Sequence, residues 1–136
     1  MKKFWILVII VLVGIQFIPN EQHNPPVEYD LSAPNDVKDI LRKACYDCHS
    51  NETNWAWYTK VAPLSWLTTS DVNNGRKKLN FSEWGNMRTS DQAKMKEEIW
   101  EEVREENMPL WQYRIMHPST KLSIEEKNAL RNWATN

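Results

Sequence analysis

The sequence predicts an all-α fold, and three observations lead to that prediction. Residues 34–49, 90–107 and 123–136 each place apolar side chains three or four positions apart, as an amphipathic helix does. No segment alternates apolar and polar residues convincingly in the way that a half-buried strand would. The 136 residues include only three glycines, which argues against a turn-rich β-sandwich. A chain of this length has room for one compact domain and little more.

The first 19 residues differ in composition from the rest of the chain. Lys2 and Lys3 precede an almost unbroken apolar run over 4–18, and Pro19 ends it. Positive charge followed by an apolar run is typical of a secretory signal or an N-terminal anchor. The run spans about 22 Å as a helix, less than the ~30 Å of a bilayer core, but snorkelling lysines and local thinning could cover the difference. The stretch IQFIPNEQ offers no small-x-small cleavage site, so we expect an uncleaved anchor helix with the domain on the exported side.

Residues 20–33 are polar and contain a Pro25-Pro26 pair. This composition predicts a semi-extended tether, which leaves 34–136 as the folded domain.

The first helix of that domain is expected over 34–49. Val37, Ile40, Leu41, Ala44 and Cys48 follow one another at helical spacing and form a single apolar stripe. The two cysteines of the chain therefore fall at the C-terminal end of this helix, near its apolar face.

Two more helices are expected towards the C-terminus. One, over 90–107, has Thr89 or Ser90 as its cap and buries Ile99, Trp100 and Val103. Another begins at Ser123, where SIEE forms a capping box with Glu126. Between residues 53 and 88 the pattern predicts a helix starting near Pro63 and a further turn at 71–79.

The stretch KACYDCHSNE, residues 43–52, contains both cysteines and one of three histidines. The spacing Cys45-x-x-Cys48-His49 is compatible with a covalent haem site, half of a zinc site, or a redox dithiol. A structural zinc site needs four ligands, and only the distant His117 or His23 could complete one. A redox dithiol is expected at the start of a helix, whereas this pair ends one. C-x-x-C-H places two thiols and an imidazole on one helical turn, as a covalent haem site requires. The predicted export also favours covalent haem, because haem is usually attached to proteins on the exported side. Zinc and thiol chemistry remain alternatives.

Longer stretches then show a resemblance to a known family. The motif ACYDCHSN is followed by TNWAWYTKVAPLSW, DVNNGRKKLNFSEW and MPLWQYRIMHPSTKLSIEEKNALRNW. Over residues 34–136 these resemble the small bacterial haem-binding domain family that carries C-x-x-C-H, and their order resembles that of class I cytochromes c. The resemblance implies a cytochrome c-like helical domain with long loops around one covalent haem c. It also implies a bacterial inner-membrane protein with its domain in the periplasm; a cleaved signal and a soluble periplasmic domain is the alternative.

The expected iron site follows from the motif and the resemblance. Cys45 and Cys48 would form thioethers to the haem, and His49 would be the proximal iron ligand. Met108 stands in a Met-Pro pair after the acidic helix, and the match to this pair makes it the expected distal ligand. His117, also followed by a proline, is the alternative distal ligand, and an empty sixth position is a further one.

Other residues are expected around the cofactor. Arg76 could pair with a haem propionate. Trp57 and Trp66 are expected to pack against the haem, within a larger aromatic set. The members of that set are Trp55, Trp57, Tyr58, Trp66, Trp84 and Trp111.

These features predict a monohaem c-type domain that passes single electrons to an unknown redox partner. No acid–base pair or nucleophile constellation stands out, so we do not expect an enzyme. The alternatives are a haem-based sensor or peroxidase-like protein with a labile sixth ligand, and a zinc-stapled scaffold. A net charge of −1 gives no reason to expect nucleic acid as a partner.

Overall fold

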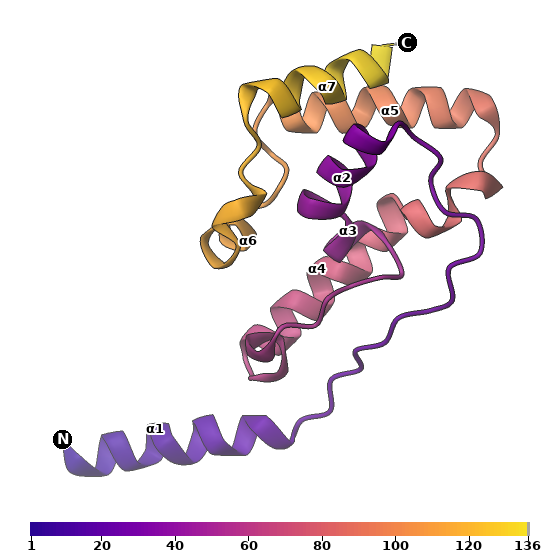
Figure 1. Ribbon diagram of the computed structural model, residues 1–136. Helices are drawn as coiled ribbons and strands as arrows, with labels where there is room; N and C mark the ends of the chain where they lie inside the picture. Colours follow the sequence, from indigo (N-terminus) through magenta and orange to yellow (C-terminus); the bar gives the residue numbers. More distant parts are fainter. Residues whose placement is uncertain (136) are drawn as a thin grey trace.

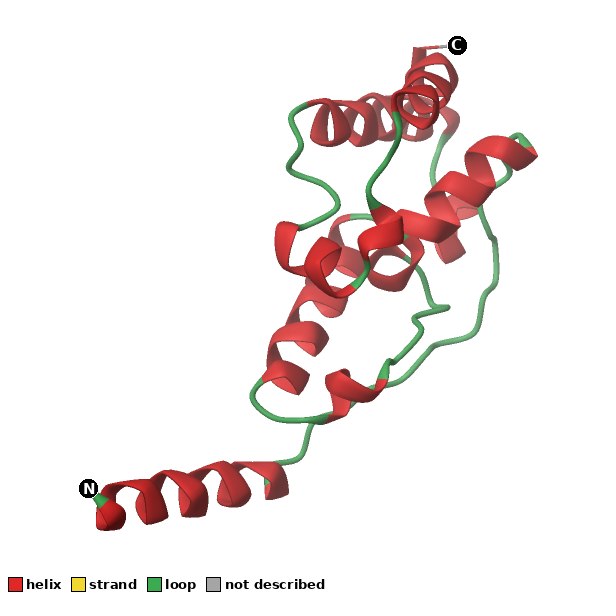
Figure 2. Ribbon diagram, turned by 60° about the vertical axis from the view of Figure 1, so that its left-hand side comes forward, coloured by secondary structure: helices red, strands yellow, loops and turns green. Residues whose placement is uncertain are grey.

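The computed structural model describes residues 1–135, and within that range it contains helices and loops but no strand (Figures 1 and 2). This confirms the predicted all-α class. The α-helices are α1 (Lys2–Gly14), α2 (Asn35–Ala44), α3 (Tyr46–His49), α4 (Leu64–Lys78), α5 (Thr89–Arg104), α6 (Trp111–Met116) and α7 (Ile124–Thr135). Short 3₁₀ turns are η1 (Ile15–Phe17), η2 (Trp57–Lys60), η3 (Phe81–Asn86) and η4 (Pro118–Thr120).

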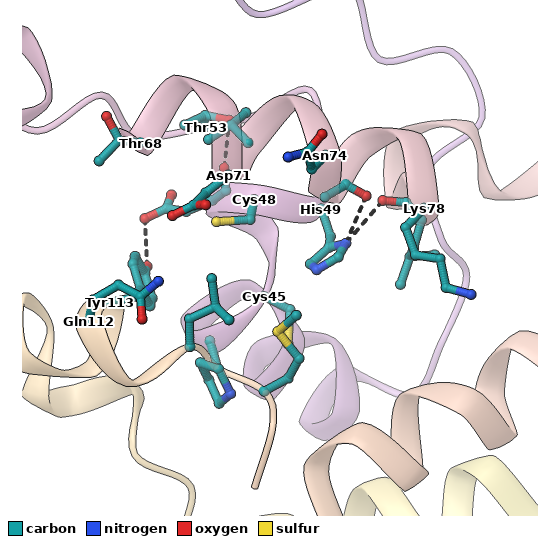
Figure 3. A pocket seen from close by; sticks show the side chains of 18 of the residues that line it. Cys45, Cys48, His49, Thr53, Thr68, Asp71, Asn74, Lys78, Gln112 and Tyr113 are labelled. Carbon is teal, nitrogen blue, oxygen red and sulfur yellow. Dashed lines mark hydrogen bonds between the residues drawn. The ribbon is translucent and has the colours of Figure 1, made fainter. Parts of the chain in front are cut away.

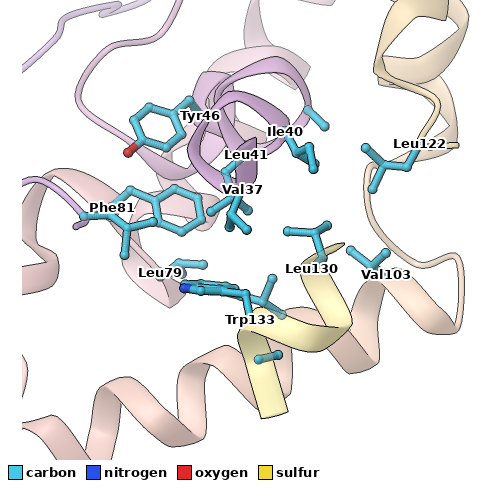
Figure 4. Close-up of a cluster of buried hydrophobic side chains, with 14 of the residues drawn as sticks. Val37, Ile40, Leu41, Tyr46, Leu79, Phe81, Val103, Leu122, Leu130 and Trp133 are labelled. Carbon is cyan, nitrogen blue, oxygen red and sulfur yellow. The ribbon is translucent and has the colours of Figure 1, made fainter. Parts of the chain in front are cut away.

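The hydrophobic core lies where α2, α5 and α7 meet. Leu41 of α2 and Leu130 of α7 have no exposed surface, and Val103 of α5 is 2 % exposed. Figure 4 shows Leu41 and its neighbours on α2 turned towards Leu130 and Trp133. The apolar stripes predicted for these three helices are therefore the faces that pack together.

The helix predicted over 34–49 is interrupted at Cys45, which corrects the sequence expectation. Cys45 has φ −125° and ψ −34°, outside helical geometry, and separates α2 from α3. The interruption turns α3 so that Tyr46 reaches the core, where its ring stacks on Phe81 with centroids 4.9 Å apart. α3 then packs against α4, with Cys45 between α2 and α3 and Cys48 within α3.

The helix predicted near Pro63 is present as α4, and it absorbs the separate turn expected at 71–79. α4 crosses α3 closely at Gly75. A Cβ added there would lie 2.5 Å from the carbonyl oxygen of Cys48. Only glycine allows this approach of the two backbones.

The capping box predicted at Ser123 is confirmed. The Ser123 N–H donates to Glu126 Oε2 at 2.9 Å, and the Glu126 N–H donates to Ser123 Oγ at 3.2 Å. The cap predicted for α5 is wrong, because Thr89 lies inside the helix and Arg88 precedes it without a capping side-chain bond.

Residues 20–33 are extended, as predicted, but they are packed on the domain. The N–H groups of Tyr29 and Leu31 donate to the carbonyls of Ser82 and Phe81 at 3.0 and 2.9 Å. Asn24 Nδ2 donates to the Thr53 carbonyl at 2.9 Å, and Leu31 is 1 % exposed. The segment is therefore held against the helical domain by these contacts.

α1 leaves the domain at one end and buries none of its residues (Figures 1 and 2). Among the helices described, none is both long and apolar enough to cross a membrane, so the anchor part of the predicted fold is not supported.

Candidate functional site

A cavity of about 720 Å³ lies beside the two cysteines. Its walls come from α3 and α4, from the segment 53–59 between them, from α5 from Met95 onwards, and from the segment 108–116. The volume falls within the range of cofactor and small-molecule sites, roughly 300–1,000 Å³. Most of the lining is apolar, with members that include Leu64, Leu67, Val72, Leu79, Phe81, Ile99, Val103, Leu110 and Ile115.

Cys45, Cys48 and His49 all line this cavity, as Figure 3 shows. Neither cysteine is in a disulfide. Burial, together with the neighbouring Cys48, raises the pKa of the Cys45 thiol to about 12. Burial, with the carboxyls of Asp47 and Asp71, raises the pKa of Cys48 to about 12. Both thiols are therefore protonated at neutral pH, unlike the low-pKa thiols of redox dithiols.

The His49 ring is oriented by two carbonyls near the C-terminus of α4. Its Nδ1 lies 3.1 Å from the Gly75 oxygen and 3.1 Å from the Leu79 oxygen (Figure 3). Carbonyls accept, so Nδ1 holds the proton and Nε2 keeps its lone pair free. Burial lowers the pKa of His49, although the two carbonyls oppose this effect. A neutral imidazole whose Nδ1 donates to a backbone carbonyl is the usual form of a metal-ligating histidine.

Met108 lines the same cavity from a different element. The chain turns sharply as α5 ends, with Glu106 in left-handed geometry at φ 60°. The N–H groups of Asn107 and Met108 both donate to the Glu102 carbonyl, at 3.0 and 3.2 Å. This turn brings Met108 into the cavity wall immediately after the helix.

His117 is placed differently. It does not line the cavity, and its Nε2 lies 2.6 Å from the hydroxyl of Tyr58. Its ring also stacks on Tyr113, with centroids 4.5 Å apart. Of the two predicted distal ligands, Met108 alone is part of the cavity wall.

The arrangement fits a haem: a large apolar cavity, two free thiols, a neutral imidazole with an available nitrogen, and a thioether. A family model described as haem-binding domain matches residues 10–136. The chain belongs to this family. No curated protein and no solved structure matches the chain. The predicted resemblance to the haem-binding domain family is confirmed, and the match extends N-terminally beyond residue 34.

Zinc gains no support from the geometry of this haem-binding domain. Within residues 1–135, no three His, Cys, Asp or Glu side chains are grouped so that they could hold a metal ion.

The two tryptophans predicted to pack on the haem do not line the cavity. Trp57 is 76 % exposed in η2. Trp66, on α4, is not part of the cavity wall, and its Nε1 is buried without a hydrogen-bond partner. From the wider aromatic set, Trp55 and Tyr58 do line the cavity. Trp84 instead lies in the core, with its ring centroid 6.2 Å from that of Trp133.

Arg76 also lies away from the cavity, so its position does not support the predicted propionate contact. Its guanidinium donates to the Ser50 carbonyl at 2.7 Å and to the His23 carbonyl at 2.9 Å. It donates further to Asn24 Oδ1 and Thr53 Oγ1, each at 2.9 Å. Arg76 thus fastens the extended 20–33 segment and the loop after α3 to α4.

Three residues at the site were missed by sequence reasoning. Gly75 permits the α3–α4 crossing, and its carbonyl also orients His49. The chain has only three glycines, and this scarcity was the signal that could have pointed to a structural role for Gly75. Tyr113 donates to Asp47 Oδ2 at 2.7 Å, which ties α6 to the middle of the C-x-x-C-H motif. No local pattern marks this pair, because the two residues are 66 positions apart.

Proposed function

We propose that this domain holds one haem c covalently through Cys45 and Cys48. In this proposal His49 Nε2 and the Met108 sulfur would hold the iron from the two walls of the cavity that they line. The observation that supports it best is the fixed tautomer of His49. Its Nδ1 is engaged by two carbonyls, so Nε2 is the nitrogen available in the cavity that the thiols and Met108 also line.

The task we propose is single-electron transfer without catalysis of a substrate reaction. The bound haem supplies a reversible one-electron iron couple. The residues of the chain set its surroundings: the apolar walls exclude water, and a histidine–methionine pair raises the potential relative to two histidines. The protein would work on the exported side of a bacterial membrane, with α1 as its attachment to that membrane.

The test is the mass of the denatured full chain after production in a host that attaches haem c. We expect the wild type to keep one haem through denaturation and solvent extraction. Cys45→Ala and Cys48→Ala together should abolish this retained mass, whereas Met87→Ala, away from the cavity, should keep it. A wild type that releases all its haem on denaturation would refute covalent attachment, and a chain that binds none would refute the proposal.

A sensor or peroxidase-like function is the second candidate, and one observation favours it. α6, which follows Met108, buries none of its residues, so little burial holds the chain beyond Met108 in place. Fast binding of carbon monoxide to the reduced protein would favour this candidate. Absence of such binding would favour the electron carrier.

A further inference from the structure

The η2–α4 turn, residues 57–63, presents apolar side chains beside the point where α1 leaves the domain. Trp57 is 76 % exposed and Val61 is 44 % exposed. Neither lines the cavity, so a bound haem would not cover them. Large exposed side chains of this kind that cluster together usually mark a contact surface.

The chain just after α1 is hydrogen-bonded to this turn and to the start of α4. Gln16, just after α1, accepts from the Ala62 N–H at 2.9 Å and donates to the Ala62 carbonyl at 3.0 Å. Asn20 adds a bond to the Ser65 carbonyl at 3.0 Å. Whatever surrounds the C-terminal end of α1 is therefore close to the η2–α4 turn.

A bilayer is the surrounding that suits α1. Its side chains from Phe4 to Val13 are apolar on every side of the helix, and those exposed range from 49 % to 62 % exposure. A second helix or a second protein copy would cover one stripe and leave the others in water. Lipid covers a helix all round, and Lys2 and Lys3 at its start suit a headgroup region.

We propose that the η2–α4 turn rests on the membrane surface, with Trp57 and Val61 at the level of the lipid headgroups. Tryptophan is enriched at that level because its ring is apolar while its N–H stays hydrated. The domain is then held in one orientation. Leu64 and Leu67, in the first turn of α4, also line the cavity. The part of the cavity beside the N-terminus of α4 therefore lies next to the lipid surface. This inference rests on the proposed membrane attachment through α1.

Photo-crosslinking of the full, haem-loaded chain in phosphatidylcholine vesicles tests the orientation. The photoreactive residue p-benzoylphenylalanine replaces one side chain at a time: Trp57→p-benzoylphenylalanine, Ile9→p-benzoylphenylalanine in α1, and Ile124→p-benzoylphenylalanine in α7. Ile124 is 74 % exposed, which matches Trp57, and α7 lies at the opposite end of the molecule from α1 (Figures 1 and 2).

We expect lipid adducts at positions 9 and 57 and none above background at 124. Adducts at position 9 without adducts at position 57 would overturn the proposed contact between the η2–α4 turn and the membrane, while leaving the membrane attachment of α1 intact. Absence of adducts at all three positions would overturn the membrane attachment as well. A crosslinked protein dimer at position 57 would show that a second copy of the chain, and not lipid, contacts the turn. The absorption spectrum of each sample reports haem loading independently of these outcomes.

Discussion

Met108 and His117 differ in the contacts that their side chains make. Met108 lines the cavity, whereas the His117 ring is hydrogen-bonded to Tyr58 and stacked on Tyr113. Met108→Ala should therefore lose the low-spin absorption spectrum of a six-coordinate haem, and His117→Ala should keep it. The opposite pattern, with His117→Ala losing the low-spin spectrum, would reverse the assignment.

Gly75 is the residue on which the contact between α3 and α4 depends. In Gly75→Ala the new Cβ would stand 2.5 Å from the Cys48 oxygen, so the two backbones must move apart. We expect a loss of about 1–3 kcal/mol in the free energy of unfolding, typical of overpacking, with a shifted haem spectrum because the Gly75 carbonyl orients His49. Denaturant titration measures the first effect.

Asn73→Ala is the matched control, because Asn73 is an exposed residue of the same helix outside the cavity wall. It should change the free energy of unfolding by no more than ~0.5 kcal/mol. Equal losses in the two variants would contradict the steric explanation.

Single residues were predictable where the chemistry is local. Cys45, Cys48 and His49 are adjacent in the chain, so their common place in the cavity wall follows from spacing alone. Arg76, Trp57 and Trp66 depend on which side of α4 or η2 faces the cavity. That side is set by contacts with distant segments, such as the four bonds that fix Arg76.

At the scale of elements, one side-chain hydrogen bond ties α6 to α3. α6 buries no residue, and Tyr113 donates to Asp47 at 2.7 Å. Tyr113→Phe should cost about 1–3 kcal/mol of unfolding free energy, because it leaves a carboxyl oxygen of Asp47 without this donor. It should also let added imidazole displace the Met108 ligand more readily, as a spectral titration would show.

Tyr29→Phe is the control for this variant, since Tyr29 is 54 % exposed. It should leave imidazole affinity unchanged. An unchanged imidazole affinity in Tyr113→Phe as well would show that this bond does not hold the ligand segment.

The extended segment 20–33 is attached to α2 and α3 through Asp30. Lys38 Nζ lies 2.7 Å from Asp30, and the Tyr46 hydroxyl donates to it at 2.9 Å. Burial acts to raise the pKa of Asp30, but the bonds from Lys38 and Tyr46 outweigh it and lower the pKa below its ordinary value of 3.8. The unfolded chain thus binds the proton more tightly, and the stabilisation is lost as pH falls through the folded-state pKa.

Asp30→Asn should therefore destabilise the protein near neutral pH, and its difference from wild type should shrink below about pH 4. Thermal unfolding across pH measures this difference. Asp39→Asn, at an exposed position on α2, should show no comparable dependence. A pH-independent difference for Asp30→Asn would contradict the ion-pair account.

The helices and their buried faces were predictable from apolar periodicity, but the positions of the helix ends were less predictable. The buried faces of α2, α5 and α7 follow from apolar spacing, and the start of α7 follows from its capping box. The break at Cys45 was not visible, because the apolar stripe runs on through residues 44 and 48. It arises from tertiary packing, since Tyr46 must reach Phe81 while α3 meets α4.

At the scale of the whole molecule, composition predicted an N-terminal apolar segment and a helical domain, but it did not predict that the segment between them packs on the domain. A polar, proline-containing stretch such as 20–33 is usually a linker. Here its backbone bonds to Ser82 and Phe81, and Arg76 bonds to its residues His23 and Asn24. Those partners lie about 50 residues further along, so no local pattern could reveal them.

The visible absorption spectrum of the full chain, oxidised and reduced, tests the central claim most directly. The protein should be produced in a host able to attach haem c. A low-spin spectrum in both oxidation states, retained by the chain after denaturation, is the predicted result for haem c held by Cys45 and Cys48 between His49 and Met108. A high-spin spectrum would contradict the six-coordinate electron carrier, and a chain with no covalent haem would contradict the account as a whole.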